Sequence, residues 1–210
     1  DGHDVIWDDG IAEEKSFSSW YNDIISTLPD MIVFESKTPV IKKHWKIINQ
    51  LKKDLPECKI VLLGDHVTAL PEESFLNSKV DYVITGGNYD FGLRSLIRHL
   101  HNEKEPLDSG IWWSKDNQLL NSGKTLSLHH DLNELPYLDR DLTQWRLYSE
   151  KNGNFKYLPG TYMMVGRDCW WGRCTFCSWT TLHPHGKFKV QTPGKALDEV
   201  EHLVYNYGIK

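Results

Sequence analysis

Short apolar runs recur along the first part of this chain at intervals of about 25 residues, the spacing typical of βαβ units. They occupy residues 5–7, 31–34, 59–63 and 82–85. Each run is apolar on both faces, as parallel strands are when helices cover both sides of their sheet. The pattern predicts an α/β fold with a doubly wound parallel sheet in this part of the chain.

Amphipathic segments separate these runs. Apolar side chains recur at helical spacing in residues 17–28, 45–55 and 93–100, and Ser16 stands where the first of these helices would be capped. A further helix is predicted to begin near Pro193, with Thr192 as its cap. Five of its side chains are expected to face inward: Leu197, Val200, Leu203, Val204 and Tyr207.

The composition excludes several classes of protein. The chain has 210 residues, of which 40% are hydrophobic and 25% charged, and it contains neither a long apolar run nor a charged leader. We therefore expect a soluble, cytoplasmic protein without a transmembrane segment. The net charge of -5 and the scattered lysines provide no basic surface for nucleic acid. Because the sequence begins at Asp1 instead of a methionine, we expect a piece of a longer protein.

Three of the four cysteines lie in one short stretch, Cys169-Trp-Trp-Gly-Arg-Cys174-Thr-Phe-Cys177. On a loop, three sulfur atoms can converge on one metal centre, and an odd number of thiols in a reducing compartment argues against disulfides. Structural zinc normally needs a fourth ligand, such as His183 or His185. An iron–sulfur cluster held by three thiolates instead keeps one iron open. The spacing favours the cluster and leaves zinc as the alternative.

A second candidate site follows from the predicted sheet. Ligands of open α/β sheets bind beyond the carboxyl ends of the strands. Those ends lead here into loops at residues 35–38, 64–73 and 85–90, which contain three glycines, Gly64, Gly86 and Gly87. Each glycine either lets a cofactor approach the backbone closely or serves only a sharp turn, and both interpretations stay open.

The loop sequences resemble those of a known family. Residues 64–73 read Gly-Asp-His-Val-Thr-Ala-Leu-Pro-Glu-Glu, and residues 80–86 read Val-Asp-Tyr-Val-Ile-Thr-Gly. Together they resemble the amino-terminal cobalamin-binding domain of radical S-adenosylmethionine (radical SAM) enzymes, over residues 1–105. That domain usually opens with a further strand and helix, which this chain lacks. The family's loops enclose cobalamin, which implies contacts from these residues: Ser36, Thr38, Gly64, His66, Thr68, Gly86 and Gly87.

The cysteine stretch resembles the same family. Radical SAM enzymes carry the motif Cys-x-x-x-Cys-x-aromatic-Cys after the first strand of a TIM-type barrel. Cys174-Thr-Phe-Cys177 matches its second half, whereas the first gap here has one residue more than the motif. The resemblance implies a 4Fe-4S cluster on Cys169, Cys174 and Cys177, with S-adenosylmethionine bound at the open iron and against Phe176. Cys58 has no part in this motif.

The resemblance also implies a reaction and its partners. A 5'-deoxyadenosyl radical would remove hydrogen from an unreactive carbon of a small-molecule substrate, and cobalamin would donate a methyl group. Other members of the family use the same cofactors for ring cyclisation. The electron would come from a donor such as flavodoxin or ferredoxin. A non-catalytic cobalamin-binding protein and a zinc-stapled interaction module remain the alternatives.

The rest of the chain divides into a connector and a second domain. Residues 106–155 are expected to form a hairpin, with an Asp116-Asn117 turn, and a linker. Residues 156–210 would begin the radical SAM barrel, with a strand at residues 161–165 before the cluster loop. Because most of a barrel would be absent, we expect no substrate turnover by these 210 residues alone.

Two histidines bear on how cobalamin would bind. Asp1-Gly2-His3 resembles the start of the cobalt-ligand motif Asp-x-His-x-x-Gly, but the final glycine is missing and His3 precedes a predicted strand. His66 follows a strand, where it would contact the cofactor's nucleotide tail. We therefore expect no histidine ligand on cobalt.

Overall fold

The computed structural model describes residues 2–124, 130–150, 154–183 and 188–210. The chain forms two compact units, and each is described by itself. We call residues 27–130 and 167–188 the sheet unit, and residues 1–26, 131–166 and 189–210 the second unit. The chain therefore leaves the sheet unit after His130 and returns to it at Arg167.

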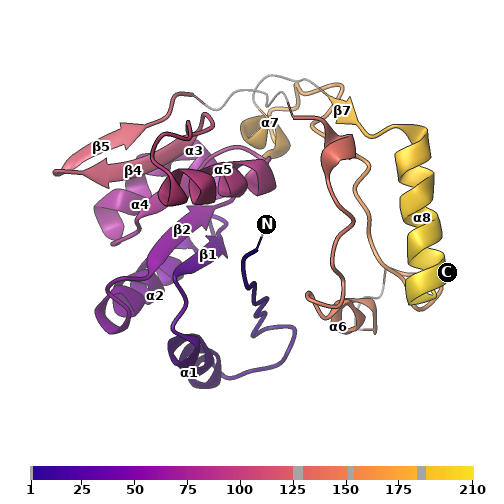
Figure 1. Ribbon diagram of the computed structural model, residues 1–210, viewed down its shortest axis with the longest axis horizontal. Helices are drawn as coiled ribbons and strands as arrows, with labels where there is room; N and C mark the ends of the chain where they lie inside the picture. Colours follow the sequence, from indigo (N-terminus) through magenta and orange to yellow (C-terminus); the bar gives the residue numbers. More distant parts are fainter. Residues whose placement is uncertain (1, 125–129, 151–153, 184–187) are drawn as a thin grey trace. The chain divides into compact units, whose positions relative to one another are not determined.

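The sheet unit contains a five-stranded sheet in the order β1-β2-β3-β4-β5 (Figure 1). Strands β1, β2 and β3 run parallel, whereas β4 is antiparallel to β3 and β5 is antiparallel to β4. The predicted α/β class is confirmed, with a mixed sheet in place of a purely parallel one. The strands span Met31–Glu35 (β1), Lys59–Leu63 (β2), Tyr82–Ile84 (β3), Ile111–Lys115 (β4) and Gln118–Asn121 (β5).

Helices α2 (Ile41–Asp54) and α5 (Tyr89–His101) form where the periodicity predicted helices. Residues 64–73, expected to be a loop, instead contain α3 (Asp65–Ala69) and the start of α4 (Pro71–Asn77), and the short helix α7 (Trp179–Leu182) was not predicted. Helix α2 packs into the core through apolar side chains that recur at helical spacing: Ile41, Trp45, Ile48 and Leu51 are all buried. Its polar face, rich in lysine, faces solvent.

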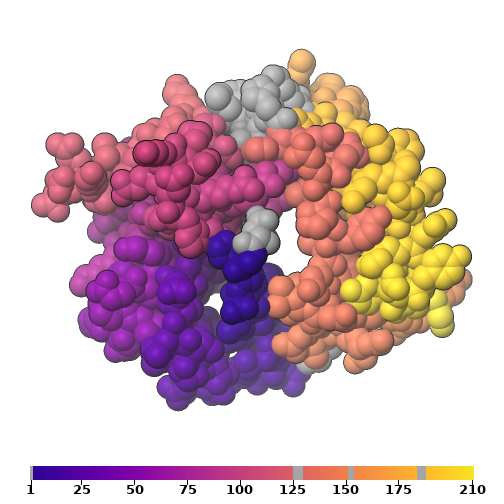
Figure 2. All heavy atoms as spheres, viewed as in Figure 1, coloured from indigo at the N-terminus to yellow at the C-terminus, as the bar shows by residue number. Residues whose placement is uncertain are grey.

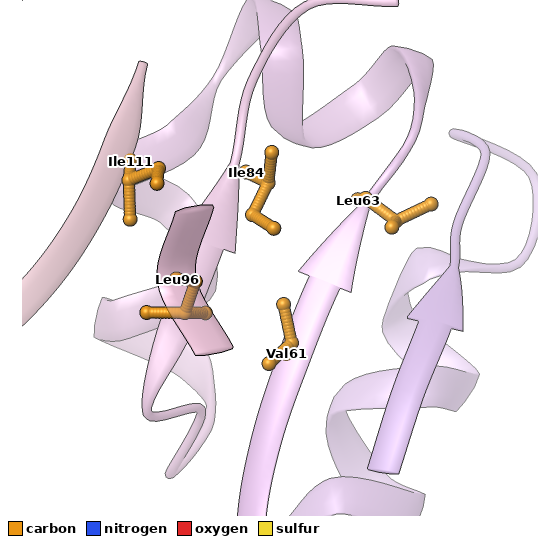
Figure 3. Close-up of a cluster of buried hydrophobic side chains, with 5 residues drawn as sticks. All are labelled: Val61, Leu63, Ile84, Leu96 and Ile111. Atoms are coloured by element: carbon orange, nitrogen blue, oxygen red, sulfur yellow. The ribbon is translucent and has the colours of Figure 1, made fainter. Parts of the chain in front are cut away.

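Both faces of the sheet are covered. Leu96 of α5 packs against Val61, Leu63, Ile84 and Ile111 (Figure 3). The neighbouring residues along β2 and β3 point to the opposite face because strand side chains alternate. These neighbours, Ile60, Leu62 and Val83, are fully buried as well. Each such side chain contributes roughly 1.5–3 kcal/mol relative to an exposed one.

The predicted hairpin is confirmed and forms one edge of the sheet, from which it projects in Figure 2. Its turn residues, Asp116 and Asn117, have φ angles of 53° and 61°. Two consecutive positive φ angles define the type I′ turn, whose twist matches that of the paired strands.

The second unit contains α1 (Phe17–Thr27), which ends at the unit boundary, the 3₁₀ turn η1 (Leu132–Glu134), α6 (Trp145–Glu150), β7 (Lys189–Val190) and α8 (Pro193–Tyr207). Both predicted caps are confirmed. Ser16 Oγ accepts a hydrogen bond from the Ser19 amide at 3.1 Å, and Thr192 Oγ1 accepts one from the Lys195 amide at 3.3 Å.

Arg140 is buried in this unit, where its guanidinium donates to Thr161 Oγ1 and to the Tyr162 carbonyl, both at 2.9 Å.

Two predicted strands are wrong. Residues 5–7 form no strand, and Val5, Ile6 and Trp7 are exposed. Among the described residues no strand pairs with them, and the indole of Trp7 instead donates to the Tyr148 hydroxyl. Residues 161–165 are not a strand either; two of them bond the Arg140 side chain, and the assigned strand is the short β6 (Gly166–Arg167).

The inward face predicted for α8 is correct only in part. Leu203 is buried, as expected. Leu197, Val200 and Val204 are exposed, and Glu199 is buried in their place beside Arg140. Helical periodicity predicted the helix correctly, but it did not predict which face the neighbouring chain covers.

Across the residues that the structure describes, no helix is long and apolar enough to cross a membrane.

The hairpin turn generates a stability prediction. Replacing Asn117 by Ala should lower the free energy of unfolding by about 1 kcal/mol, because alanine is strained at positive φ. Asn117→Gly should stay within about 0.5 kcal/mol of the wild type, because glycine adopts this conformation freely. Urea unfolding of the two variants measures the difference. Equal stability of the Ala and Gly variants would contradict the turn assignment.

Candidate cofactor site

The carboxyl ends of β1, β2 and β3 meet at one edge of the sheet, because the three strands are parallel. The loops that leave this edge bring the predicted cobalamin contacts into one region of the sheet unit. Ser36 is held at the edge by its backbone amide, which donates to the Leu63 carbonyl at 2.7 Å. Its hydroxyl is fully buried and bonds His44 Nδ1 at 2.9 Å.

Gly64 is required by the neighbouring backbone. Its φ of +119° lies in the region that favours glycine, and a Cβ there would overlap the carbonyl oxygen of Ser36. The close contact therefore joins the loops after β1 and β2. This packing accounts for the glycine without any cofactor.

His66 lies on α3 and is buried. Its Nδ1 bonds Thr38 Oγ1 at 3.1 Å, and its Nε2 bonds Glu73 Oε2 at 2.9 Å. The indole of Trp45 meets the imidazole edge to face, with ring centroids 5.9 Å apart. Both ring nitrogens therefore have partners within the chain, and the histidine holds Thr38 in place.

Thr68 joins the loops after β2 and β3. Its hydroxyl donates to the Gly64 carbonyl at 2.8 Å and accepts the Gly86 amide at 3.0 Å. The Tyr89 hydroxyl lies beside this bridge, near Thr68 and the Gly64 backbone, is buried, and makes no hydrogen bond of good geometry in the described part of the chain. Burial and the nearby carboxylates raise the pKa of Tyr89, so the hydroxyl keeps its proton. A protonated hydroxyl whose bonds are poorly formed is a donor that a ligand at this edge could accept.

The thiol-bearing segment, residues 167–183, also belongs to the sheet unit, and we call it the strap. Arg167, the first residue of the strap, forms a bidentate ion pair: Nη1 and Nη2 each contact one carboxylate oxygen of Asp90 at 2.7 Å. Arg167 also donates to Asn88 Oδ1 at 3.2 Å and lies over the Phe91 ring. Burial opposes ionisation of Asp90, yet the Arg167 hydrogen bonds and charge outweigh it and lower the pKa of that carboxyl.

The far end of the strap contacts the same loop. The Gly87 amide donates to the Leu182 carbonyl at 2.9 Å, and the His183 imidazole lies so close to Gly87 that a Cβ there would overlap it. Helix α7, which Leu182 ends, lies against α3. Burial lowers the pKa of His183, so its imidazole is neutral near pH 7.

The three thiols lie between these two attachments. Cys169, Cys174 and Cys177 are free and partly buried. The Cys177 amide donates to the Cys174 carbonyl at 3.3 Å, so the last two thiols share one turn. Among the described residues, no three His, Cys, Asp or Glu side chains are already arranged as a metal site. The donor set fits a three-thiolate cluster in type and number.

Three aromatic side chains of the strap are exposed to solvent, whereas Trp179 is half-buried. Trp170, Trp171 and Phe176 are all exposed, and Phe176, the predicted S-adenosylmethionine contact, is 90% exposed. Of the two possible zinc-completing histidines, His183 packs on Gly87, and His185 lies outside the described residues.

Cys58 is in a different environment. It directly precedes β2 and so lies at the amino end of that strand, whereas the candidate site lies at the carboxyl end. Burial raises the pKa of its thiol, which keeps the thiol protonated and unreactive.

Comparisons with known proteins agree with this arrangement. No family model matches the sequence. Over 209 residues the chain is 24% identical to an uncharacterized methyltransferase of Pyrococcus horikoshii, covering 99% of this chain and 44% of that protein. Among solved structures, the radical SAM methyltransferase TsrM from Kitasatospora setae, with cobalamin and a 4Fe-4S cluster bound, matches with a TM-score of 0.64 and 13% identity. The alignment covers 98% of this chain and 41% of TsrM.

A second solved structure matches in the same way. The cobalamin-dependent radical SAM enzyme OxsB, with aqua-cobalamin bound, has a TM-score of 0.69 and 18% identity, over 93% of this chain and 26% of OxsB. The chain shares the fold of cobalamin-dependent radical SAM enzymes. The resemblance found in the sequence is thereby confirmed at the level of the fold. The chain spans less than half the length of each protein with which it is compared.

Sequence reasoning missed the residues that attach the strap to the loop after β3 and the buried hydroxyl of Tyr89. Arg167 and Asp90 are separated by 77 positions, so no local pattern relates them. The run Gly86-Gly87-Asn88-Tyr89-Asp90 did identify the loop, because its glycines follow a predicted strand.

The half-buried imidazole of His44 at this edge generates a prediction on pH. Burial lowers the pKa of His44, so the folded chain holds it neutral while the unfolded chain protonates it below about pH 6.5. The stability that neutral His44 contributes is therefore complete above that pH and declines below it. His44→Asn should destabilise more near pH 8 than near pH 5.5, by up to about 1 kcal/mol. Urea unfolding at both pH values measures this difference.

Equal destabilisation by His44→Asn at the two pH values would show that the assignment of a neutral imidazole is wrong.

Proposed function

We propose that this chain is the cofactor-binding part of a cobalamin-dependent radical SAM enzyme that transfers a methyl group to an unreactive carbon. The observation that carries the proposal is the strap. It attaches three free thiols to the loop after β3, at the sheet edge where ligands of α/β folds bind. The shared fold with TsrM and OxsB supports the same assignment.

Within this proposal, Cys169, Cys174 and Cys177 hold a 4Fe-4S cluster, and Phe176 contacts S-adenosylmethionine at its open iron. When bound, these cofactors supply the electron transfer that generates a 5'-deoxyadenosyl radical, and cobalamin supplies the methyl group. The protein's own part is to bring the two sites to one edge of the sheet and to hold them there.

Cobalamin is proposed to bind at the loops that carry Ser36, Thr38, Gly64, His66, Thr68 and Gly86. Thr38, which is exposed although its hydroxyl bonds His66, and the buried Tyr89 hydroxyl are the groups best placed to contact it. Ser36 and His66 act through the backbone and through Thr38, since their own polar atoms are already bonded. We assign Gly87 to the strap, because the His183 imidazole occupies the space beside it.

Methyl transfer is favoured over ring cyclisation because the Pyrococcus horikoshii relative and TsrM are both named methyltransferases. The substrate is proposed to be a small molecule, with a flavodoxin or ferredoxin as the electron donor. Because the chain spans 26–44% of the proteins compared, activity is proposed for the whole enzyme rather than for these 210 residues.

The cluster assignment predicts iron content. After anaerobic reconstitution the chain should hold about four irons, and Cys169→Ala, Cys174→Ala or Cys177→Ala should each abolish most of that binding. Cys58→Ala is the matched control and should retain the iron, because this buried thiol lies at the opposite end of β2. Metal analysis and the absorption spectrum of each variant provide the measurement.

Two outcomes would contradict the assignment. Loss of iron in the Cys58→Ala variant would show that the wrong thiols were chosen. Stoichiometric zinc without iron in the wild-type chain would favour a zinc-stapled interaction module.

The site geometry also predicts how cobalt is coordinated. Both ring nitrogens of His66 are occupied by Thr38 and Glu73, so no protein imidazole should bind cobalt. Electron paramagnetic resonance of bound Co(II) cobalamin should therefore be identical in unlabelled protein and in protein containing ¹⁵N-histidine. A label-dependent change in the nitrogen splitting that disappeared in His66→Ala or His183→Ala would refute this expectation.

A further inference from the structure

The strap is attached at both ends to one short loop. Arg167 bonds Asp90 and Asn88, while Leu182 and His183 contact Gly87. The three thiols lie between the two attachments, and the loop that receives them directly follows Gly86. One loop, residues 86–90, therefore belongs to both proposed cofactor sites.

The first attachment depends on the planar fork of arginine. Two parallel bonds of 2.7 Å to one carboxylate fix the guanidinium in direction as well as in distance, which a lysine ammonium cannot reproduce. The guanidinium also lies 5.5 Å from the centre of the buried Phe91 ring. Asp90 stands in the first turn of α5, where a carboxylate is favoured by the helix dipole.

The second attachment depends on the absence of a side chain. The Gly87 amide is satisfied by the Leu182 carbonyl, and the imidazole of His183 fills the space that a Cβ would need. Any displacement of residues 182–183 leaves that backbone amide without its partner. The loop conformation and the strap position are thus fixed together.

We propose that the strap couples the two cofactor sites, so that a cluster on the thiols tightens corrinoid binding through Arg167 and Asp90. The proposal rests on the proposed function and adds a positioning role for these two residues. Metal binding draws the three thiols together and so restricts the strap further between its two attachments, and the restricted strap holds residues 86–90. A corrinoid then binds a loop whose ordering cost has already been met. By linkage, the corrinoid strengthens cluster retention by the same factor.

The test measures the dissociation constant of hydroxocobalamin for the 210-residue chain before and after cluster reconstitution, by equilibrium dialysis without oxygen. In the wild type, reconstitution should tighten binding at least about fivefold, the lower end of typical coupling between sites. Arg167→Met should reduce that ratio to near one. Arg167→Lys should restore only a small part of it, because the charge remains and the fork is lost.

Arg94→Met is the matched control. The Arg94 guanidinium lies 5.3 Å from the same Phe91 ring but belongs to α5 and not to the strap. This variant should keep the wild-type ratio. Asp90→Asn should lower the ratio as Arg167→Met does. The double variant should have the same ratio as either single variant, because both changes remove the same interaction.

A second measurement does not depend on either cofactor. Hydrogen exchange of the cofactor-free chain should be faster at residues 167–183 in Arg167→Met than in Arg94→Met. Equal exchange of this segment in the two variants would overturn the attachment itself. Exchange across the rest of the chain shows whether a variant has lost its fold.

The outcomes separate the two proposals. If the wild-type chain binds hydroxocobalamin neither before nor after cluster reconstitution, the proposed function is overturned, and the coupling with it. Binding of equal strength before and after reconstitution overturns the coupling alone. A wild-type ratio that persists in Arg167→Met refutes the role of the Arg167–Asp90 pair.

Discussion

The ion pair between Arg167 and Asp90 holds the start of the three-thiol segment against the loop after β3. The chain leaves the sheet unit after His130 and returns at Arg167, so this residue makes the first contact on return. The returning segment has little regular structure, because it contains only β6 and the short helix α7. Such a segment has few backbone bonds of its own to hold it in place. The two short bonds to Asp90 and the face of Phe91 provide that order at the point where the three-thiol stretch begins.

The sheet edge that receives the strap is rigid for a different reason. Its polar groups are mostly bonded to one another: Ser36 to His44, His66 to Thr38 and Glu73, and Thr68 to Gly64 and Gly86. A partly buried network of this kind favours one arrangement, because each buried member left unpaired would cost the desolvation of a polar group. Tyr89 is the exception at this edge, since its buried hydroxyl makes no hydrogen bond of good geometry among the described residues. The edge is therefore preorganised except at one donor.

Features with a local cause could be predicted from the sequence. The strands and helices around the sheet follow from apolar periodicity, the caps follow from Ser16 and Thr192, and the type I′ turn follows from Asp116-Asn117. Features that depend on a distant partner could not. Residues 5–7 and 161–165 are suited to strands but form none in the described part of the chain, and α8 buries Glu199 as well as Leu203, because Arg140 lies beside Glu199. Pairing and burial are decided by the rest of the chain, which a local pattern does not contain.

The glycines of the candidate site illustrate the same limit and bear on how a cofactor could approach. Their positions after strands indicated either turns or close approach by a ligand, but at Gly64 and Gly87 the close neighbour is the chain itself, Ser36 in one case and His183 in the other. A ligand that needed the space beside Gly87 would have to displace His183 and break the second strap attachment. Gly86 has a positive φ of 90°, and its amide is already bonded to Thr68. A corrinoid that contacts the loops at Thr38, Thr68 and Gly86 therefore leaves the strap in place, which is the condition under which the two sites can strengthen each other.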